Sequence, residues 1–174
     1  MRRVLLVGLF FCMFVGIGVA KGNIAILETG GNASFYGKAW GDHTVERVFD
    51  GNEKGNHMTI DIVRVAANKD GGAIIERIWD SKVSISKIEL DTTGSGCVYE
   101  YKLLYWDLVE QEWNEIIYIK ENSSAKVVHE FKTPIVTNKM RFIPYKAGPS
   151  GTENYINIKQ ISYYGELSLL PPNE

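Results

Sequence analysis

Residues 155–164 have the sequence Tyr-Ile-Asn-Ile-Lys-Gln-Ile-Ser-Tyr-Tyr, and this stretch decides the fold class. It is rich in isoleucine and tyrosine, two residue types that favour strands, and Gly165 follows it. The stretch therefore predicts a closing β-strand that ends at Gly165. Because successive side chains of a strand point to opposite faces, only one of Tyr163 and Tyr164 can point into the core.

Shorter runs of the same kind precede this segment, and turn residues separate them. We expect strands at residues 24–27, 58–66, 73–79, 83–90, 98–106, 113–119, 127–131 and 139–143. The alternation in 83–90 slips by one residue near Ser86-Lys87, which indicates a β-bulge. Eight or nine strands at this spacing, with little helical periodicity, predict an all-β antiparallel β-sandwich or jelly roll.

The connections between these strands are expected to be polar turns and loops. Residues 30–41 are loop-like, Asp80-Ser81 is expected to form a turn, and Pro134 lies in an expected loop. Residues 45–49 are expected to form one helical turn or a short strand. Trp106 and Trp113 would bracket a hairpin and pack on each other or on the core.

The first 20 residues have the features of a signal peptide. Arg2 and Arg3 precede an apolar or glycine run at 4–19, and Gly18-Val19-Ala20 offers small residues for cleavage. This pattern predicts a secreted or periplasmic protein with a β-sandwich domain at 21–166 and a tail at 167–174. The alternative is an uncleaved membrane anchor, although the run is short for a span of about 20 residues.

The charge of the chain excludes several classes of partner. With Arg2 and Arg3 removed from the 19 basic residues, 17 remain against 21 acidic ones, a formal net charge of −4. No basic run stands out, so we expect neither nucleic acid nor an anionic membrane as a partner.

Cys97 is the only cysteine outside the first 20 residues, so that part of the chain cannot form an internal disulfide. A buried thiol is expected there.

Six segments, in this order along the chain, carry a resemblance to a known family. They are Asn23-Ile24-Ala25, Phe49-Asp50-Gly51-Asn52, 84–90, 101–106 with Trp113, 139–142 and 158–165. Together they resemble the discoidin-like, or coagulation-factor C-type, galactose-binding β-sandwich domains, whose fold many bacterial carbohydrate-binding modules share. The chain departs from that family in lacking a tryptophan at 53–58, in a longer segment at 55–72, and in having Gln160 where a glutamate is frequent.

The resemblance implies a structural Ca²⁺ at the Asp-Gly-Asn turn. Asp50 would supply a carboxylate, Asn52 a carbonyl oxygen and Gln160 a neutral amide oxygen, and Ca²⁺ binds oxygen ligands of these kinds. The alternative is an ordinary Asp-Gly turn with no metal.

The resemblance also implies a ligand site at loop ends, near the segment 35–43. A sugar has apolar C–H faces and a rim of hydroxyls, so its site needs an exposed aromatic ring and fixed polar groups. Trp40 would stack on the sugar, with Tyr36 beside it in the same loop, and Asp42 and His43 would bind its hydroxyls. His57 would approach from the longer segment at 55–72. The alternative is that the aromatic residues of the loop cover the core.

Signals of catalysis are weak. His43, His57 and His129 are scattered without metal-ligand spacing, and no Gly-x-Ser-x-Gly elbow occurs. Asn32 and Asn122 fit the glycosylation pattern, and Arg141 would contact either a ligand or an acidic neighbour.

Three functions remain, and the first is favoured. It is a secreted, non-enzymatic module that binds a carbohydrate or glycoprotein. The second is a protein-interaction or structural envelope component on the same fold. The third is a small hydrolase or lyase, which would need a cleft with converging carboxylates of perturbed pKa.

Overall fold

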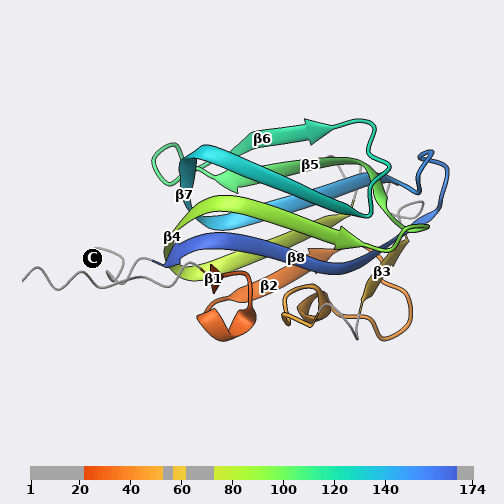
Figure 1. Ribbon diagram of the computed structural model, residues 1–174. Coiled ribbons are helices and arrows are strands. Elements are labelled where there is room, and N and C mark those ends of the chain that lie inside the picture. The colour runs from red at the N-terminus through yellow and green to blue at the C-terminus, as the bar shows by residue number, and fades with distance from the viewer. Residues whose placement is uncertain (1–21, 53–56, 62–72, 168–174) are drawn as a thin grey trace, which may run out of the picture.

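The computed structural model describes residues 22–52, 57–61 and 73–167 (Figure 1). These residues form eight strands and two short 3-10 helices. The strands are β1 (Gly22–Asn23), β2 (Asn32–Tyr36), β3 (Met58–Asp61), β4 (Ile74–Thr92), β5 (Val98–Trp106), β6 (Trp113–Ile119), β7 (Lys126–Ala147) and β8 (Tyr155–Leu167). The 3-10 helices are η1 (Leu27–Thr29) and η2 (Val45–Val48).

The described strands pair antiparallel, and two of them pass from one layer of the molecule to the other. The first layer contains β2, the start of β4, the end of β7, β5 and β6, with Ile75 of β4 opposite Phe142 of β7. The second contains residues 83–92 of β4 and 126–137 of β7, together with β8, β1 and β3. The predicted all-β antiparallel β-sandwich is confirmed (Figure 1).

The facing side chains of the two layers form one apolar core. Tyr163 is buried there, stacked on Phe49 at 6.4 Å between ring centroids and edge-on to Trp79 at 5.4 Å. Tyr164 lies on the other face of β8, under the ammonium group of Lys87. The predicted opposite orientation of the two tyrosines is therefore confirmed, and Cys97 has the expected buried thiol.

Two predicted elements at the start of the domain are wrong. The expected strand at 24–27 is a turn that leads into η1, since pairing with β8 stops at Asn23. The expected loop at 30–41 contains β2, whose residues pair with Ile74–Ile78 of β4. β2 is a five-residue edge strand with no fully buried residue, and only Phe35 and Tyr36 in it are typical strand formers, so its signal in the sequence is weak and its pairing with β4 stabilises it.

Two expected interruptions are also absent from the described strands. β4 runs through Asp80-Ser81, where it changes layers, and β7 runs through Pro134, which lies in the register irregularity opposite Ile85–Lys87. The register shift between Ile78 and Val83 marks the bend in β4, and the one between Ile85 and Lys87 confirms the predicted bulge.

Several other predicted boundaries can be compared with the structure. The expected strands at 98–106 and 113–119 are confirmed as β5 and β6, and residues 45–48 form the expected helical turn. The strand expected at 58–66 extends to Asp61 within the described residues, and 62–72 lie outside them. β8 continues past Gly165 to Leu167. The predicted signal peptide, 1–20, and residues 168–174 of the predicted tail lie outside the described residues.

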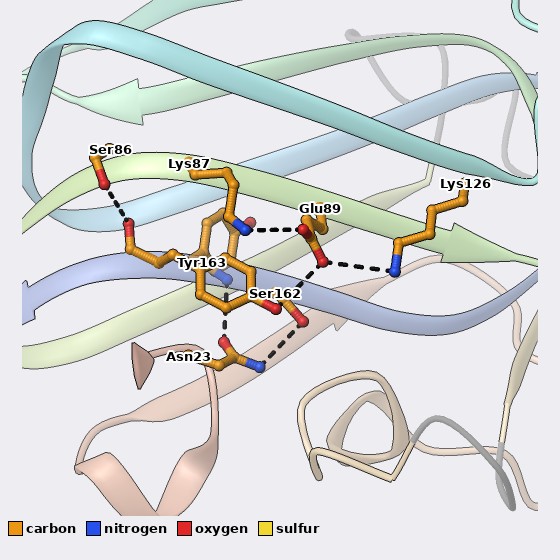
Figure 2. Close-up of polar contacts among 8 residues, drawn as sticks. Asn23, Ser86, Lys87, Glu89, Lys126, Ser162 and Tyr163 are labelled. Carbon is orange, nitrogen blue, oxygen red and sulfur yellow. Dashed lines mark hydrogen bonds and ion pairs between the residues drawn. The ribbon is translucent and has the colours of Figure 1, made fainter. Parts of the chain in front are cut away.

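Asn23 connects the start of the domain to its closing strand (Figure 2). Its Oδ1 accepts the backbone N–H groups of Ala25, at 3.0 Å, and Tyr163, at 3.1 Å. Its Nδ2 donates to Oγ of Ser162 at 3.0 Å. The opening motif therefore has a physical role, since one amide side chain fixes the turn at 24–26 against β8.

The loss of the Asn23 amide is expected to destabilise the domain. Asn23→Ala leaves two backbone N–H groups without their acceptor, so we expect the free energy of unfolding to fall by about 1–3 kcal/mol. Urea denaturation followed by tryptophan fluorescence measures the change. Asn32→Ala, at an exposed position of β2, is the matched control and should change stability by less than about 0.5 kcal/mol. Equal effects of the two substitutions would contradict the role of Asn23.

Glu89 is the centre of a charged network on the outer face of the second layer (Figure 2). Its carboxylate accepts from Lys87 at 2.9 Å and from the Tyr164 hydroxyl at 3.2 Å, and Lys126 lies at 3.7 Å. The hydrogen bond from Lys87 lowers the pKa of Glu89. Because these groups are close to solvent, the network adds little to stability.

Arg77 is a fully buried arginine in the middle of the core. Its guanidinium donates to carbonyl oxygens on both sides of η1, at the start of β2 and on its own strand: Ala25, Ile26, Gly30, Asn32 and Ile78. Burial lowers the pKa of Arg77. Through these hydrogen bonds Arg77 holds the irregular segment 25–32 against β4.

Candidate ligand-binding site

A pocket lies at the end of the sandwich where β8 begins. Its volume is about 340 Å³, and we call it the Trp40 pocket. Six side chains line it: Trp40, His43, His57, Thr59, Tyr155 and Asn157. It thus combines two large aromatic rings with imidazole, hydroxyl and amide groups, the composition typical of a small-molecule site.

Backbone pairing fixes the position of Trp40. The Trp40 N–H donates to the Thr59 carbonyl at 2.9 Å, and the Asp61 N–H donates to the Lys38 carbonyl at 2.9 Å. The segment around Ala39 therefore lies along β3 as a short extension of the second layer. This pairing leaves the Trp40 side chain 62% exposed, edge-on to Tyr155 at 6.4 Å between ring centroids.

His43 has a defined tautomer in this pocket. The backbone N–H of Thr59 donates to its Nδ1 at 3.0 Å, so Nδ1 must be unprotonated and Nε2 carries the proton of the neutral ring. Burial, and then the charge of Arg47 and the neighbouring His57, lower the pKa of His43. The two imidazole rings lie edge-to-face, 5.4 Å apart. At neutral pH, His43 can therefore donate one hydrogen bond from Nε2.

Asn157 and Thr59 form the polar wall of the pocket. They are opposite each other on β8 and β3, and the Thr59 hydroxyl donates to Oδ1 of Asn157 at 2.7 Å. Neighbouring strands hold both side chains, so the position of the Asn157 amide is fixed before any ligand arrives. Such preorganisation reduces the entropic cost of binding.

The structure brings together three of the five predicted ligand residues, namely Trp40, His43 and His57. Tyr36 is exposed on β2, and neither it nor Asp42 is among the residues that line the Trp40 pocket. The Asp42 carboxylate instead lies 3.5 Å from the Arg47 guanidinium, in a solvent-exposed ion pair.

Sequence reasoning missed Thr59, Tyr155 and Asn157. A signal for two of them was present, because Tyr155 and Asn157 alternate with the buried Ile156 and Ile158 on the closing strand. The outward residues of a recognised strand are the ones available to a ligand. Thr59 lacks such a signal, since its side chain is buried and β3 is short.

The predicted calcium ligands lie in two different environments. Asp50 is exposed, and its Oδ1 accepts the Asn52 N–H at 2.8 Å, as in an ordinary Asx turn. Gln160 is only 2% exposed, and its Oε1 has no hydrogen-bond partner among the described residues. Buried polar atoms rarely lack a partner, so this oxygen is suited to a ligand such as a hard cation. The described residues contain no group of three or more His, Cys, Asp or Glu side chains that could hold a metal.

A larger pocket of about 680 Å³ lies at the other end of the sandwich, next to the β5–β6 turn. It contains two carboxylates, Asp107 and Glu115. Asp107 accepts the N–H groups of Val109 and Glu110 at 2.7 and 3.0 Å, and these bonds lower its pKa. Glu115 lies 2.8 Å from the Lys102 ammonium group. Both carboxylates therefore have structural partners, whereas a general acid needs a raised pKa.

The aromatic face of the first layer has structural contacts too. Trp106 and Trp113 are cross-strand partners with ring centroids 5.5 Å apart, as predicted. Arg141 stacks over Trp113 and pairs with Glu76, which confirms the expectation of an acidic neighbour. Among the described residues no helix is long and apolar enough to cross a bilayer.

The sequence matches no family model and no curated protein. Solved structures, in contrast, match over most of its length. The family 32 carbohydrate-binding module of Streptococcus pneumoniae EndoD has a TM-score of 0.64 at 14% identity, over 83% of this chain and all of that one. The chain has the fold of these modules.

Two further structures give the same result. The family 32 module of Clostridium perfringens NanJ, solved in complex with galactose, has a TM-score of 0.58 at 12% identity and covers 76% of this chain and 92% of its own. Chitosan-binding module 1 of a chitosanase/glucanase from Paenibacillus sp. IK-5 has a TM-score of 0.62 at 13% identity, over 83% and 99% of the two chains. At these identities the likeness establishes the fold, and the predicted discoidin-like β-sandwich is confirmed.

Proposed function

We propose that this protein is a secreted, non-catalytic carbohydrate-binding module and that the Trp40 pocket is its sugar site. One observation carries the proposal: an exposed indole stands beside His43, His57 and Asn157 in a preformed pocket. The indole would stack on the C–H face of a pyranose, and the imidazole and amide groups would bind its hydroxyls. Modules of the same fold are described as bound to galactose, as chitosan-binding and as fucose-binding, which supports this class of ligand.

A glycan array probed with folded residues 21–174 tests the proposal. We expect specific binding to a limited set of glycans, lost in a Trp40→Ala variant that keeps its circular dichroism spectrum. A blank array with folded protein would contradict the proposal.

The second candidate function is protein interaction. Val109 is 89% exposed and Val136 56% exposed, and both line the larger pocket at the other end of the sandwich. Exposed aliphatic side chains of this kind are typical of protein contacts. A blank array would favour this candidate, and a pull-down from the native secretome with wild-type protein and a Val109→Lys variant would test it.

Sugar binding is expected to weaken in acid because of His43. The pKa of His43 lies below its ordinary value of 6.5, so the neutral ring is fully present above pH 6.5 and is lost as the pH falls through the lowered pKa. Once protonated, Nδ1 cannot accept the Thr59 N–H. Affinity should therefore stay nearly constant down to pH 6.5 and fall by roughly tenfold once the ring is protonated below that pH, the equivalent of one lost hydrogen bond.

His43→Asn separates this effect from general acid unfolding. The Asn Oδ1 atom stands close to the position of Nδ1 and still accepts the Thr59 N–H, but it does not titrate. Titration calorimetry across the same pH range should show a nearly flat affinity for this variant. A slope as steep as that of the wild type would assign the pH dependence to another group.

We further propose that Asp50, Asn52 and Gln160 hold a structural Ca²⁺. Oε1 of Gln160, which has no hydrogen-bond partner in the part of the chain that the structure describes, and the carboxylate of Asp50 supply oxygen atoms of the kind that Ca²⁺ prefers. The 3-10 helix η2, which precedes the Asp50 turn, contacts β8. Saturating Ca²⁺ should raise the melting temperature by several degrees, since a ligand at about 100 times its Kd stabilises by about 2.7 kcal/mol. Gln160→Leu should abolish that shift. An unchanged melting temperature with EDTA, together with no calcium uptake, would contradict the calcium site and show that Asp50 forms an ordinary Asx turn without a metal.

A further inference from the structure

Trp40 lines a second pocket as well as the first. The second pocket has a volume of about 280 Å³, and its lining consists of Lys38, Ala39, Trp40, Gly41 and Asp61. We call it the Lys38 pocket. Since Trp40 is the one residue that lines both pockets, its exposed ring forms their common wall.

The backbone keeps the Lys38 pocket open. Lys38 and Trp40 are two residues apart in a segment that pairs with β3, so their side chains lie on the same face of that segment. Gly41 follows with φ of 59°, a conformation that favours glycine, and a Cβ atom placed on it would meet nothing within 4 Å. The space beside Gly41 is therefore open, and a ligand in the Lys38 pocket can approach its backbone closely.

The two pockets offer different chemistry. The Trp40 pocket contains imidazole, hydroxyl and amide groups, whereas the Lys38 pocket has one ammonium and one carboxylate group. A sugar hydroxyl both donates and accepts hydrogen bonds. Lys38 can donate to such a hydroxyl and Asp61 can accept from one, so the second pocket can also fix a pyranose ring.

We propose that this site binds an oligosaccharide of at least two sugar units, one in the Trp40 pocket and the next in the Lys38 pocket. The chain of the ligand crosses the Trp40 ring between them. This inference rests on the proposed function and makes it more specific, since a site confined to the Trp40 pocket would recognise a single terminal sugar.

Calorimetry with matched ligands tests the inference. The probes are the glycans found on an array that carries galactose-, N-acetylgalactosamine-, fucose- and glucosamine-terminated oligosaccharides of two to four units, each compared with its terminal monosaccharide. We expect the oligosaccharide to bind at least about tenfold more tightly than the monosaccharide, because the second pocket adds contacts. Galactose with lactose, and glucosamine with its β-1,4 dimer, are the first pairs to compare.

Two variants assign the gain to the second pocket. Lys38→Ala removes its donor, and Gly41→Asn adds a side chain to its lining while keeping a residue that tolerates a positive φ. Both should reduce oligosaccharide affinity about tenfold, toward that of the monosaccharide, and leave monosaccharide affinity unchanged. Lys132→Ala, at an exposed lysine of β7, is the matched control and should change neither.

The outcomes distinguish this inference from the proposed function. Equal affinity for oligosaccharide and monosaccharide, with no effect of Lys38→Ala or Gly41→Asn but a loss of binding in Trp40→Ala, would overturn the inference and leave the proposed function intact. Folded protein that binds no glycan on the array would overturn both.

Discussion

Replacing Arg77 by methionine is expected to lower the free energy of unfolding by about 4 kcal/mol or more, enough to unfold a domain of ordinary stability at moderate temperature. The methionine would fill much of the volume but none of the hydrogen-bonding capacity. Carbonyl oxygens of Ala25, Gly30 and Asn32 would lose their donor. A hydrogen bond to a charged group contributes about 1.5–3 kcal/mol, so several such losses exceed any gain from removing a buried charge.

Urea denaturation of Arg77→Met and Arg141→Met makes the comparison direct. Arg141 lies on the neighbouring strand, opposite Glu76, and its ion pair is on the outer face. Its substitution should cost about 1 kcal/mol. Arg77→Lys should remain strongly destabilised, because an ammonium group has three donors and cannot reach carbonyls on both sides as a guanidinium does. Similar losses for Arg77→Met and Arg141→Met would show that the carbonyl contacts of Arg77 add little.

Replacing Trp40 by alanine is expected to reduce sugar affinity by at least about a hundredfold, the effect of losing the central aromatic contact of a small site. The indole is the shared wall of two pockets and has no other role in the core, so the fold should be unaffected. Calorimetry with the best array ligand measures the loss, and circular dichroism checks the fold.

Tyr36→Ala is the matched control for that experiment. Tyr36 is 60% exposed, close to the 62% of Trp40, but it lies on β2 and lines neither pocket. Its substitution should leave affinity within about twofold of the wild type. A loss as large as that of Trp40→Ala would place the ligand over β2 instead of the pocket.

The sequence predicted the fold best where strands are long and alternate clearly. β5, β6 and β8 were found because each has seven or more residues and is rich in β-branched and aromatic residue types. β2 was missed because a short edge strand depends on its partner for stability. The sequence analysis divided β4 and β7 into two strands each. It did so because turn residues occur where one strand bends as well as where two strands are joined by a turn.

The candidate site was predictable in part. Trp40 and His43 lie in one short loop, so their proximity follows from the sequence, and the insertion brings His57 beside them. Asn157 and Tyr155 come from a strand more than 100 residues away, and only the register between β3 and β8 brings them to the same place. Arg77 was not singled out, because its role depends on carbonyl groups of an irregular segment that no periodicity describes.

The pairing of β1 with the last residues of β8 also determines where the Trp40 pocket lies relative to the two ends of the domain. Gly22 is opposite Gly165, so the chain enters and leaves the domain at one pole, on the left in Figure 1. Asn157 lies near the other end of β8, about 30 Å from Leu167 at a rise of roughly 3.3 Å per residue. Anything attached to either terminus, such as an anchor, a surface or a fusion partner, would therefore lie at the end of the domain opposite the Trp40 pocket. The pocket would remain accessible to long glycans.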